Sequence, residues 1–264
     1  MYAFNYHRPG SLAEATKLIA ANTEAKLLAG GQTLIPTLKQ RLAQPGDVID
    51  LGGIAELKGI KVEGGSVVIG AMTRHGEVAS SAEVKKAIPA LAALAGGIGD
   101  PQVRNLGTIG GSIANSDPAA DYPAAALGLG ATIHTSKRQI PADKFFTGMF
   151  ETALEEGEII VKVAFPAPKR AAYQKFENPA SRYAIVGVLV AETANGVRVA
   201  VTGAAPSVFR WTEAEAALGK SFAAGALDGL KAKADGLNAD IHASAEYRAH
   251  LIGVMARRAV AACG

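Results

Sequence analysis

The stretch Leu28-Ala-Gly-Gly-Gln-Thr33, together with the later stretch Gly107-Thr-Ile-Gly-Gly-Ser-Ile-Ala-Asn115, decides the fold that we expect of this chain. Each stretch places a glycine pair beside hydroxyl-bearing residues, and an apolar run typical of a strand precedes the first. Glycine lacks a Cβ and tolerates a positive φ, so consecutive backbone N–H groups can converge on one anion. The pattern leaves two interpretations open, ordinary turns or a dinucleotide site.

Neither glycine stretch has the spacing of the commonest nucleotide-binding motifs. The GxGxxG pattern of a Rossmann fold and the GxxxxGK[ST] pattern of a P-loop are both absent. Thr33 is expected to begin a helix that reaches Arg41, with Pro36 tolerated in its first turn. The positive N-terminal end of that helix would then help the first loop to bind an anion.

Composition restricts the class of protein further. The 264 residues are 49% hydrophobic and 19% charged, which is typical of a globular chain. Glycine accounts for 30 residues, whereas the roughly 7% of an average protein would give about 19. The only cysteine, Cys263, excludes an internal disulfide and an iron–sulfur cluster held by this chain's own thiolates. The five histidines lie far apart in sequence and lack zinc-ligand spacing, so no metal site is expected.

Charge and hydropathy argue against nucleic-acid and membrane proteins. The net charge is +3, and acidic and basic residues are interspersed without a long basic run. The longest apolar run, 184–191, is far shorter than the roughly 20 residues of a membrane span. The opening MYAFNYHRPG lacks the apolar core of a secretory signal. We therefore expect a cytoplasmic protein, with peripheral attachment to the inner face of the membrane left open.

Hydrophobic periodicity and turn residues predict a mixture of helices and strands. The stretch 96–112 is too rich in glycine for a regular helix or strand, and Thr212 with Glu215 has the pattern of a capping box. A change of texture near 166–175 predicts a domain boundary. The expected helices are 11–21, 33–41, 74–80, 84–95, 123–129 and 245–262; the expected strands are 25–28, 48–51, 60–62, 66–71, 131–135, 158–165, 183–192 and 197–202.

Four charged residues flank the second glycine stretch. Asp117 and Asp121 are suited either to accept hydrogen bonds from ligand hydroxyls or to form an Asp-Pro turn and a helix cap. Asp100 and Arg104 favour a surface salt bridge, with tuning of a cofactor or docking of a partner as the alternative.

Taken together, residues 29–60 and 99–125 resemble the FAD-binding medium subunit of molybdenum hydroxylases, the group of aerobic carbon monoxide dehydrogenase and bacterial xanthine dehydrogenase. The opening 4–9 and the segment 246–260 fit as well, so the resemblance covers essentially the whole chain. It implies an α+β fold, with a vanillyl-alcohol-oxidase-type (PCMH-type) FAD-binding domain of two α/β subdomains at 1–170. A small C-terminal domain with an antiparallel sheet and helices would follow at 171–264.

The resemblance also implies a non-covalent FAD whose pyrophosphate lies between the two glycine loops. Thr33 stands where the family often has Ser, and Ser112 where it often has Asn, and both keep a hydrogen-bonding group. Tyr183 would cover the flavin ring. The implied cofactor-binding residues are Lys26, Leu27, Leu28, Ala29, Gly30, Gly31, Gln32, Thr33, Leu34, Ile98, Gly107, Thr108, Gly110, Gly111, Ser112, Asn115, Asp121, Ile160 and Val186.

In such enzymes, hydroxylation takes place at a molybdenum–pterin centre on a large subunit. Electrons then pass through [2Fe–2S] clusters on a small subunit to FAD, and on to NAD⁺, a quinone or O₂. The resemblance therefore implies an electron-transfer subunit without catalytic acid, base or metal ligand of its own, in a dimer of heterotrimers. A self-sufficient flavin oxidoreductase and a binding module that has lost FAD are the alternatives.

The glycines themselves give a further expectation. A valine at Gly30 or Gly110 should place a Cβ in the space of the pyrophosphate, and so abolish FAD retention in a chain that still folds.

Overall fold

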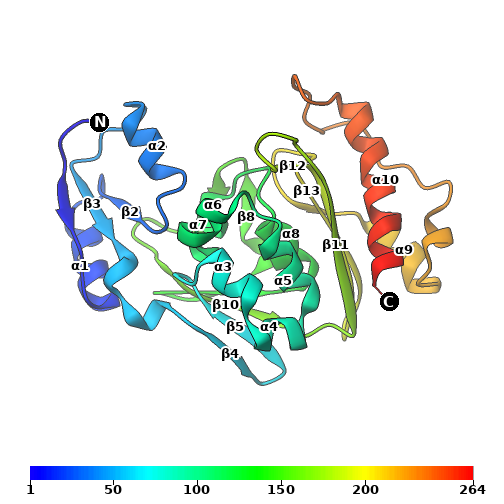
Figure 1. Cartoon of the computed structure of the whole chain (residues 1–264), viewed down its shortest axis with the longest axis horizontal. Helices are drawn as coiled ribbons and strands as arrows, with labels where there is room; N and C mark the ends of the chain where they lie inside the picture. Colours follow the sequence, from blue (N-terminus) through cyan, green and yellow to red (C-terminus); the bar gives the residue numbers. More distant parts are fainter. Residues whose placement is uncertain (264) are drawn as a thin grey trace.

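The computed structural model describes residues 1–263, which form three larger sheets and one two-stranded sheet, β8-β9, with helices packed around them (Figure 1). The N-terminal sheet is parallel, with the order β1-β3-β2, and α1 and α2 supply the connections. Ser11 caps α1 through a hydrogen bond from the Glu14 N–H, as its capping-box pattern predicts. The elements are β1 (Asn5–His7), α1 (Leu12–Ala21), β2 (Lys26–Leu28), α2 (Leu34–Lys39) and β3 (Asp47–Asp50).

The central sheet is antiparallel and has the strand order β4-β5-β10-β6-β7. Six short helices cover it and enclose the largest apolar core, around Phe145 and Phe165. Its elements are β4 (Ile60–Glu63), β5 (Ser66–Gly70), α3 (His75–Ser80), α4 (Ala82–Ala87), α5 (Pro89–Gly96), α6 (Pro101–Leu106), α7 (Ile109–Asn115), α8 (Tyr122–Gly128), β6 (Thr132–Thr135), β7 (Gln139–Pro141), β8 (Phe146–Gly148), β9 (Glu151–Thr152) and β10 (Ile160–Pro166).

The C-terminal sheet, ordered β11-β12-β13-β14, is antiparallel throughout. This bears out the mixed helix-and-sheet fold that the sequence predicts, with an antiparallel sheet in the last third. The elements are β11 (Arg170–Glu177), β12 (Ala184–Thr193), β13 (Gly196–Thr202), β14 (Phe209–Arg210), α9 (Thr212–Lys220) and α10 (Ala245–Ala262).

Strand β12 is the apolar run of the sequence, and it is buried on both faces. Leu189 and Ala191 pack into the central core, whereas Val188 and Val190 pack into the core beneath α10. Alternate residues of a strand point to opposite faces, so a strand between two cores is apolar at every position. This strand joins the last sheet firmly to the rest of the chain.

Three local predictions were wrong. The expected helix 84–95 is broken at Ile88, because the following Pro89 disfavours helical backbone in the residue before it. The stretch 96–112 holds all of α6 and the start of α7 despite its glycines. Helix α9 has Trp211 as its N-cap without a side-chain hydrogen bond, since Glu215 instead pairs with Arg210.

No helix within 1–263 combines the length and the hydropathy that crossing a membrane requires.

A buried carboxylate fixes the turn between β6 and β7 against the start of β10. The Glu158 carboxylate accepts hydrogen bonds from Arg138 (3.1 Å), the Thr135 hydroxyl (2.6 Å) and the Glu155 N–H (2.7 Å). Burial alone would raise the pKa of Glu158, but these hydrogen bonds outweigh it and lower the pKa to about 2. The charged form is therefore the one that the fold stabilises.

We predict that Glu158→Gln removes stability that depends on pH. Because the folded pKa lies below the unfolded value, the contribution is complete near neutral pH and is lost as pH falls from about 4.5 to about 2. Urea unfolding should give a wild-type advantage of roughly 3 kcal/mol near neutral pH that narrows over this interval. The exposed Glu63→Gln is the control, with an expected change within about 0.5 kcal/mol. A wild-type advantage that stays constant down to the lower pH would contradict this role.

Candidate functional site

The first glycine loop leaves β2 at Leu28 and turns into α2. Gly31 has a φ of +71°, which a residue with a Cβ adopts only under strain. Gly30 packs directly on the second loop: a Cβ built on it would lie 2.2 Å from the carbonyl oxygen of Leu106 and 2.7 Å from the Cα of Gly107. The two loops, which belong to different sheets, therefore touch through backbone atoms.

The second glycine loop opens α7. The Thr108 side chain caps this helix by accepting a hydrogen bond of 3.2 Å from the Gly111 N–H. Gly110 lies against the floor of the site, where its N–H donates to the Ala71 carbonyl at 2.8 Å. Gly111 faces the first loop, since a Cβ on it would lie 3.3 Å from the Ala29 Cβ.

The surroundings of Gly30 and Gly110 change the reason why each position requires a glycine. A Cβ on Gly30 would strike the backbone of the second loop, and a Cβ on Gly110 would lie 2.5 Å from the Ala71 Cβ. The expected reason for the effect of valine at either position, a Cβ in the space of the pyrophosphate, was therefore wrong. Both glycines permit protein to pack on protein, and that packing shapes the site.

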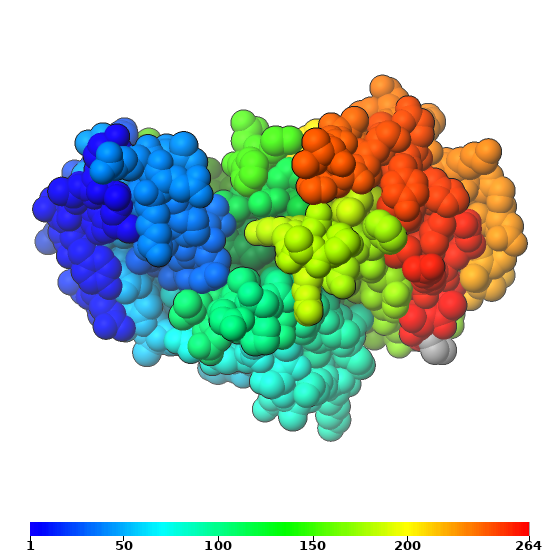
Figure 2. Space-filling view, turned by 45° about the horizontal axis from the view of Figure 1, so that its top comes forward, coloured from blue at the N-terminus to red at the C-terminus, as the bar shows by residue number. Residues whose placement is uncertain are grey.

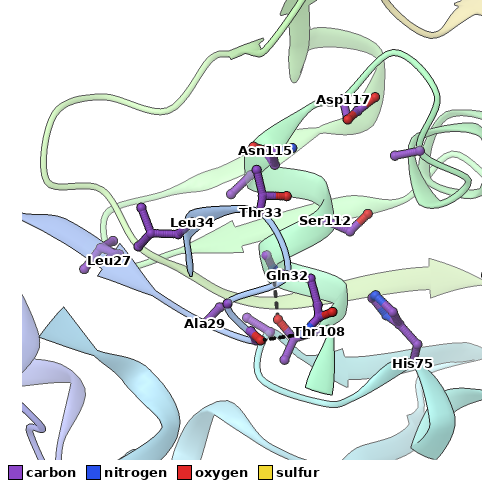
Figure 3. A pocket seen from close by; sticks show the side chains of 18 of the residues that line it. Leu27, Ala29, Gln32, Thr33, Leu34, His75, Thr108, Ser112, Asn115 and Asp117 are labelled. Carbon is purple, nitrogen blue, oxygen red and sulfur yellow. Dashed lines mark hydrogen bonds between the residues drawn. The ribbon is translucent and has the colours of Figure 1, made fainter. Parts of the chain in front are cut away.

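A cavity of about 560 Å³ lies between the two loops, within the usual size of a ligand site. Figure 2 shows the molecule hollowed between the blue N-terminal segments and the green central ones. In Figure 3 the loop with Ala29, Gln32 and Thr33 runs beside the helix that carries Ser112 and Asn115. Of the residues that the sequence indicates, these line it: Lys26, Leu27, Ala29, Gly30, Gly31, Gln32, Thr33, Leu34, Ile98, Gly107, Thr108, Gly110, Gly111, Ser112, Asn115, Asp121 and Ile160.

Leu28 and Val186 are the two indicated residues that the structure does not bring to the cavity wall. Leu28 is the last residue of β2, half-buried behind the first loop. Val186 is fully buried in the core beneath α10. Residues 181–183, a few positions before Val186 in the sequence, do line the cavity. The part of this segment that reaches the site therefore precedes the residue that we expected.

The cavity presents hydrogen-bond donors that the protein itself leaves unused. Among the described residues, the backbone N–H groups of Gly31, Gln32 and Thr33 donate to no protein acceptor. The side chains of Ser112 and Asn115 add polar groups from the first and last turns of α7. Backbone N–H and hydroxyl groups at a glycine turn are the groups that hold a diphosphate without a metal. The donor set therefore fits a dinucleotide such as FAD.

Asp121 is deeply buried and is the N-cap residue of α8, but its side chain makes no capping hydrogen bond. Its carboxylate accepts a hydrogen bond of 2.5 Å from the Tyr173 hydroxyl and lies 3.1 Å from the Lys175 ammonium. Burial raises the pKa of Asp121, and Lys175 and Tyr173 oppose that shift. Asp121 thus reaches the cavity with its charge balanced from the C-terminal sheet.

Other charged residues of this segment have structural partners. Asp117 forms the turn that the sequence predicts, accepting from the Ala119 N–H at 2.9 Å, and also lines the cavity. Asp100 and Arg104 do not form the expected salt bridge. Asp100 caps α6, while the Arg104 guanidinium donates to the carbonyls of Ile98 (3.1 Å) and Gly99 (2.8 Å). Arg104 therefore fixes the glycine-rich wall of the cavity.

His75 is a cavity residue that the sequence did not reveal. It is 5% exposed, and its Nδ1 has no hydrogen-bond partner in the part of the chain that the structure describes. Burial, with the charge of Arg104, lowers the pKa of His75 to about 4, so the ring is neutral near neutral pH. No sequence motif indicates that His75 belongs to the site, because it meets the second loop through tertiary packing against Gly107.

Comparison with known proteins places this chain in a family. Residues 2–168 match the FAD binding domain in molybdopterin dehydrogenase, and residues 171–263 match the CO dehydrogenase flavoprotein C-terminal domain. The chain is 39% identical to the carbon monoxide dehydrogenase medium chain of Hydrogenophaga pseudoflava, over 97% of this chain and 96% of that one. It is 34% identical to the xanthine dehydrogenase FAD-binding subunit of Escherichia coli O157:H7, over 98% and 97% respectively.

Solved structures agree with the sequence matches. A structure of carbon monoxide dehydrogenase from Hydrogenophaga pseudoflava superimposes with a TM-score of 0.90 at 38% identity, covering 99% of this chain and 97% of that one. Quinoline 2-oxidoreductase from Pseudomonas putida 86 gives a TM-score of 0.90 at 30% identity, with the same coverage. The chain therefore belongs to the family of FAD-binding medium subunits of molybdenum hydroxylases, and is an oxidoreductase flavoprotein subunit.

Proposed function

We propose that this chain is the electron-transfer subunit of a heterotrimeric molybdenum hydroxylase, and that it holds FAD non-covalently in the cavity between its glycine loops. The observation that carries the proposal is the meeting of the two loops at Gly30 and Gly107, with unused donors on one side of their junction. FAD, when bound, accepts electrons and passes them on singly or in pairs.

The protein's own part is to bind and to orient. The N–H groups of Gly31, Gln32 and Thr33 would hold the diphosphate from the first loop, and Ser112 and Asn115 would hold it from α7. Tyr183, which also lines the cavity, would cover the flavin ring. The chain divides into the FAD-binding part at 1–170 and the C-terminal part at 171–264. The described residues contain no cluster of His, Cys, Asp or Glu placed for a metal.

The partners are a small subunit with [2Fe–2S] clusters and a large subunit with a molybdenum–pterin centre, assembled as a dimer of heterotrimers in the cytoplasm. Supporting this, relatives such as the nicotine 6-hydroxylase medium subunit of Paenarthrobacter nicotinovorans, 36% identical over 99% of this chain, are themselves named as medium subunits. The acceptor of the flavin's electrons is NAD⁺, a quinone or O₂.

Purification of the native complex tests this assignment. The tagged chain should bring down one cluster-bearing and one molybdenum-bearing polypeptide, and denaturation should release one FAD for each copy of the chain. When a reductant is added anaerobically, the cluster signals should change before the flavin absorbance. A chain that purifies alone, and whose flavin is reduced directly by an organic substrate, would instead be a self-sufficient flavin oxidoreductase.

We predict that Gly30→Ala both destabilises the chain and releases FAD. The new Cβ would meet backbone atoms of Leu106 and Gly107, which cannot move aside without separating the loops. The cost of such overpacking is about 1–3 kcal/mol, visible as a lower unfolding midpoint and a reduced ratio of flavin to protein.

Gly219→Ala is the matched control for that substitution. Gly219 lies in α9, and a Cβ on it meets nothing within 4 Å. Gly219 is the penultimate residue of this helix, so alanine there should stabilise the chain by at most about 0.5–1 kcal/mol and leave its flavin content unchanged. Full flavin content with an unchanged midpoint in Gly30→Ala would refute the contact between the loops as the basis of binding.

A further inference from the structure

A buried lysine of the C-terminal sheet reaches across to the cavity walls. Tyr173 and Lys175 are alternate residues of β11, so both point from the same face of the strand toward the central helices. Opposite Lys175 in the ladder lies Gly187, where a Cβ would come within 2.2 Å of the Tyr173 hydroxyl oxygen. The missing side chain leaves room for the phenol to reach Asp121.

The ammonium group of Lys175 has one acceptor for each of its three protons. Its Nζ lies 2.9 Å from the Gly97 carbonyl oxygen, 2.8 Å from the Arg182 carbonyl oxygen and 3.1 Å from Oδ1 of Asp121. The side chain is only 8% exposed. A buried ammonium is stable only where its charge is paired and each of its donors has an acceptor. Moving any one of the three acceptors away would leave a donor unsatisfied, so the contacts hold the acceptors in place.

Each acceptor belongs to a different wall of the cavity. Asp121 lines the cavity directly, and Gly97 leads into the lining residues Ile98 and Gly99. The Arg182 carbonyl belongs to the segment 181–183, which lines the cavity on the side of the C-terminal sheet. Lys175 itself is not part of the lining.

The segment 181–183 is the wall that most needs such a contact. Arg182 has a φ of +61°, a left-handed conformation that costs a non-glycine residue free energy and that persists only where its surroundings impose it. The carbonyl of this same residue accepts from Lys175, and its N–H donates to the Asn178 carbonyl at 2.9 Å. The lysine therefore holds the strained residue from one side.

We propose that Lys175 is a positioning residue that fixes the shape of the FAD cavity, although it does not touch the cofactor. Its single ammonium joins Asp121, the loop of Gly97 and the segment 181–183, so that the C-terminal sheet sets the distance between three walls. This role rests on the proposed binding of FAD between the glycine loops.

The test is FAD binding by Lys175→Met, with Lys169→Met as the matched control. Lys169 also pairs with a carboxylate, that of Glu192, but its side chain is 72% exposed and far less constrained. Lys175→Met should weaken FAD binding by about tenfold or more, and should blur the shoulders of the flavin's visible absorption band because the ring gains contact with water. Lys169→Met should match the wild type in both measurements.

A double variant separates positioning from charge balance. In Lys175→Met the Asp121 charge is left unpaired, and that alone lowers stability. Asp121→Asn combined with Lys175→Met removes both charges, so the unfolding midpoint should recover relative to the single variant. Because Asp121 itself lines the cavity, Asp121→Asn alone is the reference for FAD binding. Relative to it, the double variant should still bind FAD weakly and show the blurred spectrum, since the carbonyls of Gly97 and Arg182 stay unheld.

Three outcomes of these experiments would contradict the proposal in different ways. If either variant of Lys175 folds and keeps the wild-type affinity and spectrum, Lys175 has no positioning role, whereas the FAD site stands. If binding recovers in the double variant together with stability, Lys175 only balances charge, and the inference is overturned. If the wild type and Lys169→Met hold no FAD either, the proposed function fails and this inference fails with it.

Discussion

The contact between Gly30 and the Leu106–Gly107 backbone is the constraint on which the site depends. It brings a loop of the N-terminal parallel sheet against a loop over the central antiparallel sheet, with no side chain between them. Their separation is therefore set by backbone atoms, which are stiffer than side chains. A cavity with such a junction keeps its width, and its donors on Gly31 to Thr33 stay aimed in one direction.

The second support of the site comes from the far end of the chain. Strand β12 is packed between two cores, so the sheet that carries Tyr173 and Lys175 cannot shift independently of the central helices. That rigidity lets a residue outside the cavity act on its walls. It also brings a cation to the deeply buried Asp121 carboxyl, because Lys175 lies on a strand that is itself fixed.

The sequence predicted those parts of the molecule that local patterns determine. The two glycine stretches lay where they were expected, and the apolar run at 184–191 became the central strand of the last sheet. Patterns could not predict His75, because a lone buried histidine looks the same in sequence as any other. They also failed to predict α6 and α7, because the glycines of this stretch suggested a loop. Asp100 in fact caps α6, and Thr108 caps α7. The role of Lys175 could not be predicted for a similar reason, since two of its three partners are 54 and 78 residues away in the sequence.

The same geometry suits the electron-transfer role that we propose for this chain. An electron carrier needs a cofactor held at a fixed position, and charges around it that do not change as it works. Of the ionisable groups at the cavity, Asp121 is paired with Lys175 and Glu158 with Arg138, and His75 stays neutral because its pKa is low. The backbone N–H groups of Gly31 to Thr33 and the Ser112 hydroxyl are neutral donors left for a ligand. Neutral donors of this kind would hold a diphosphate without themselves titrating near neutral pH.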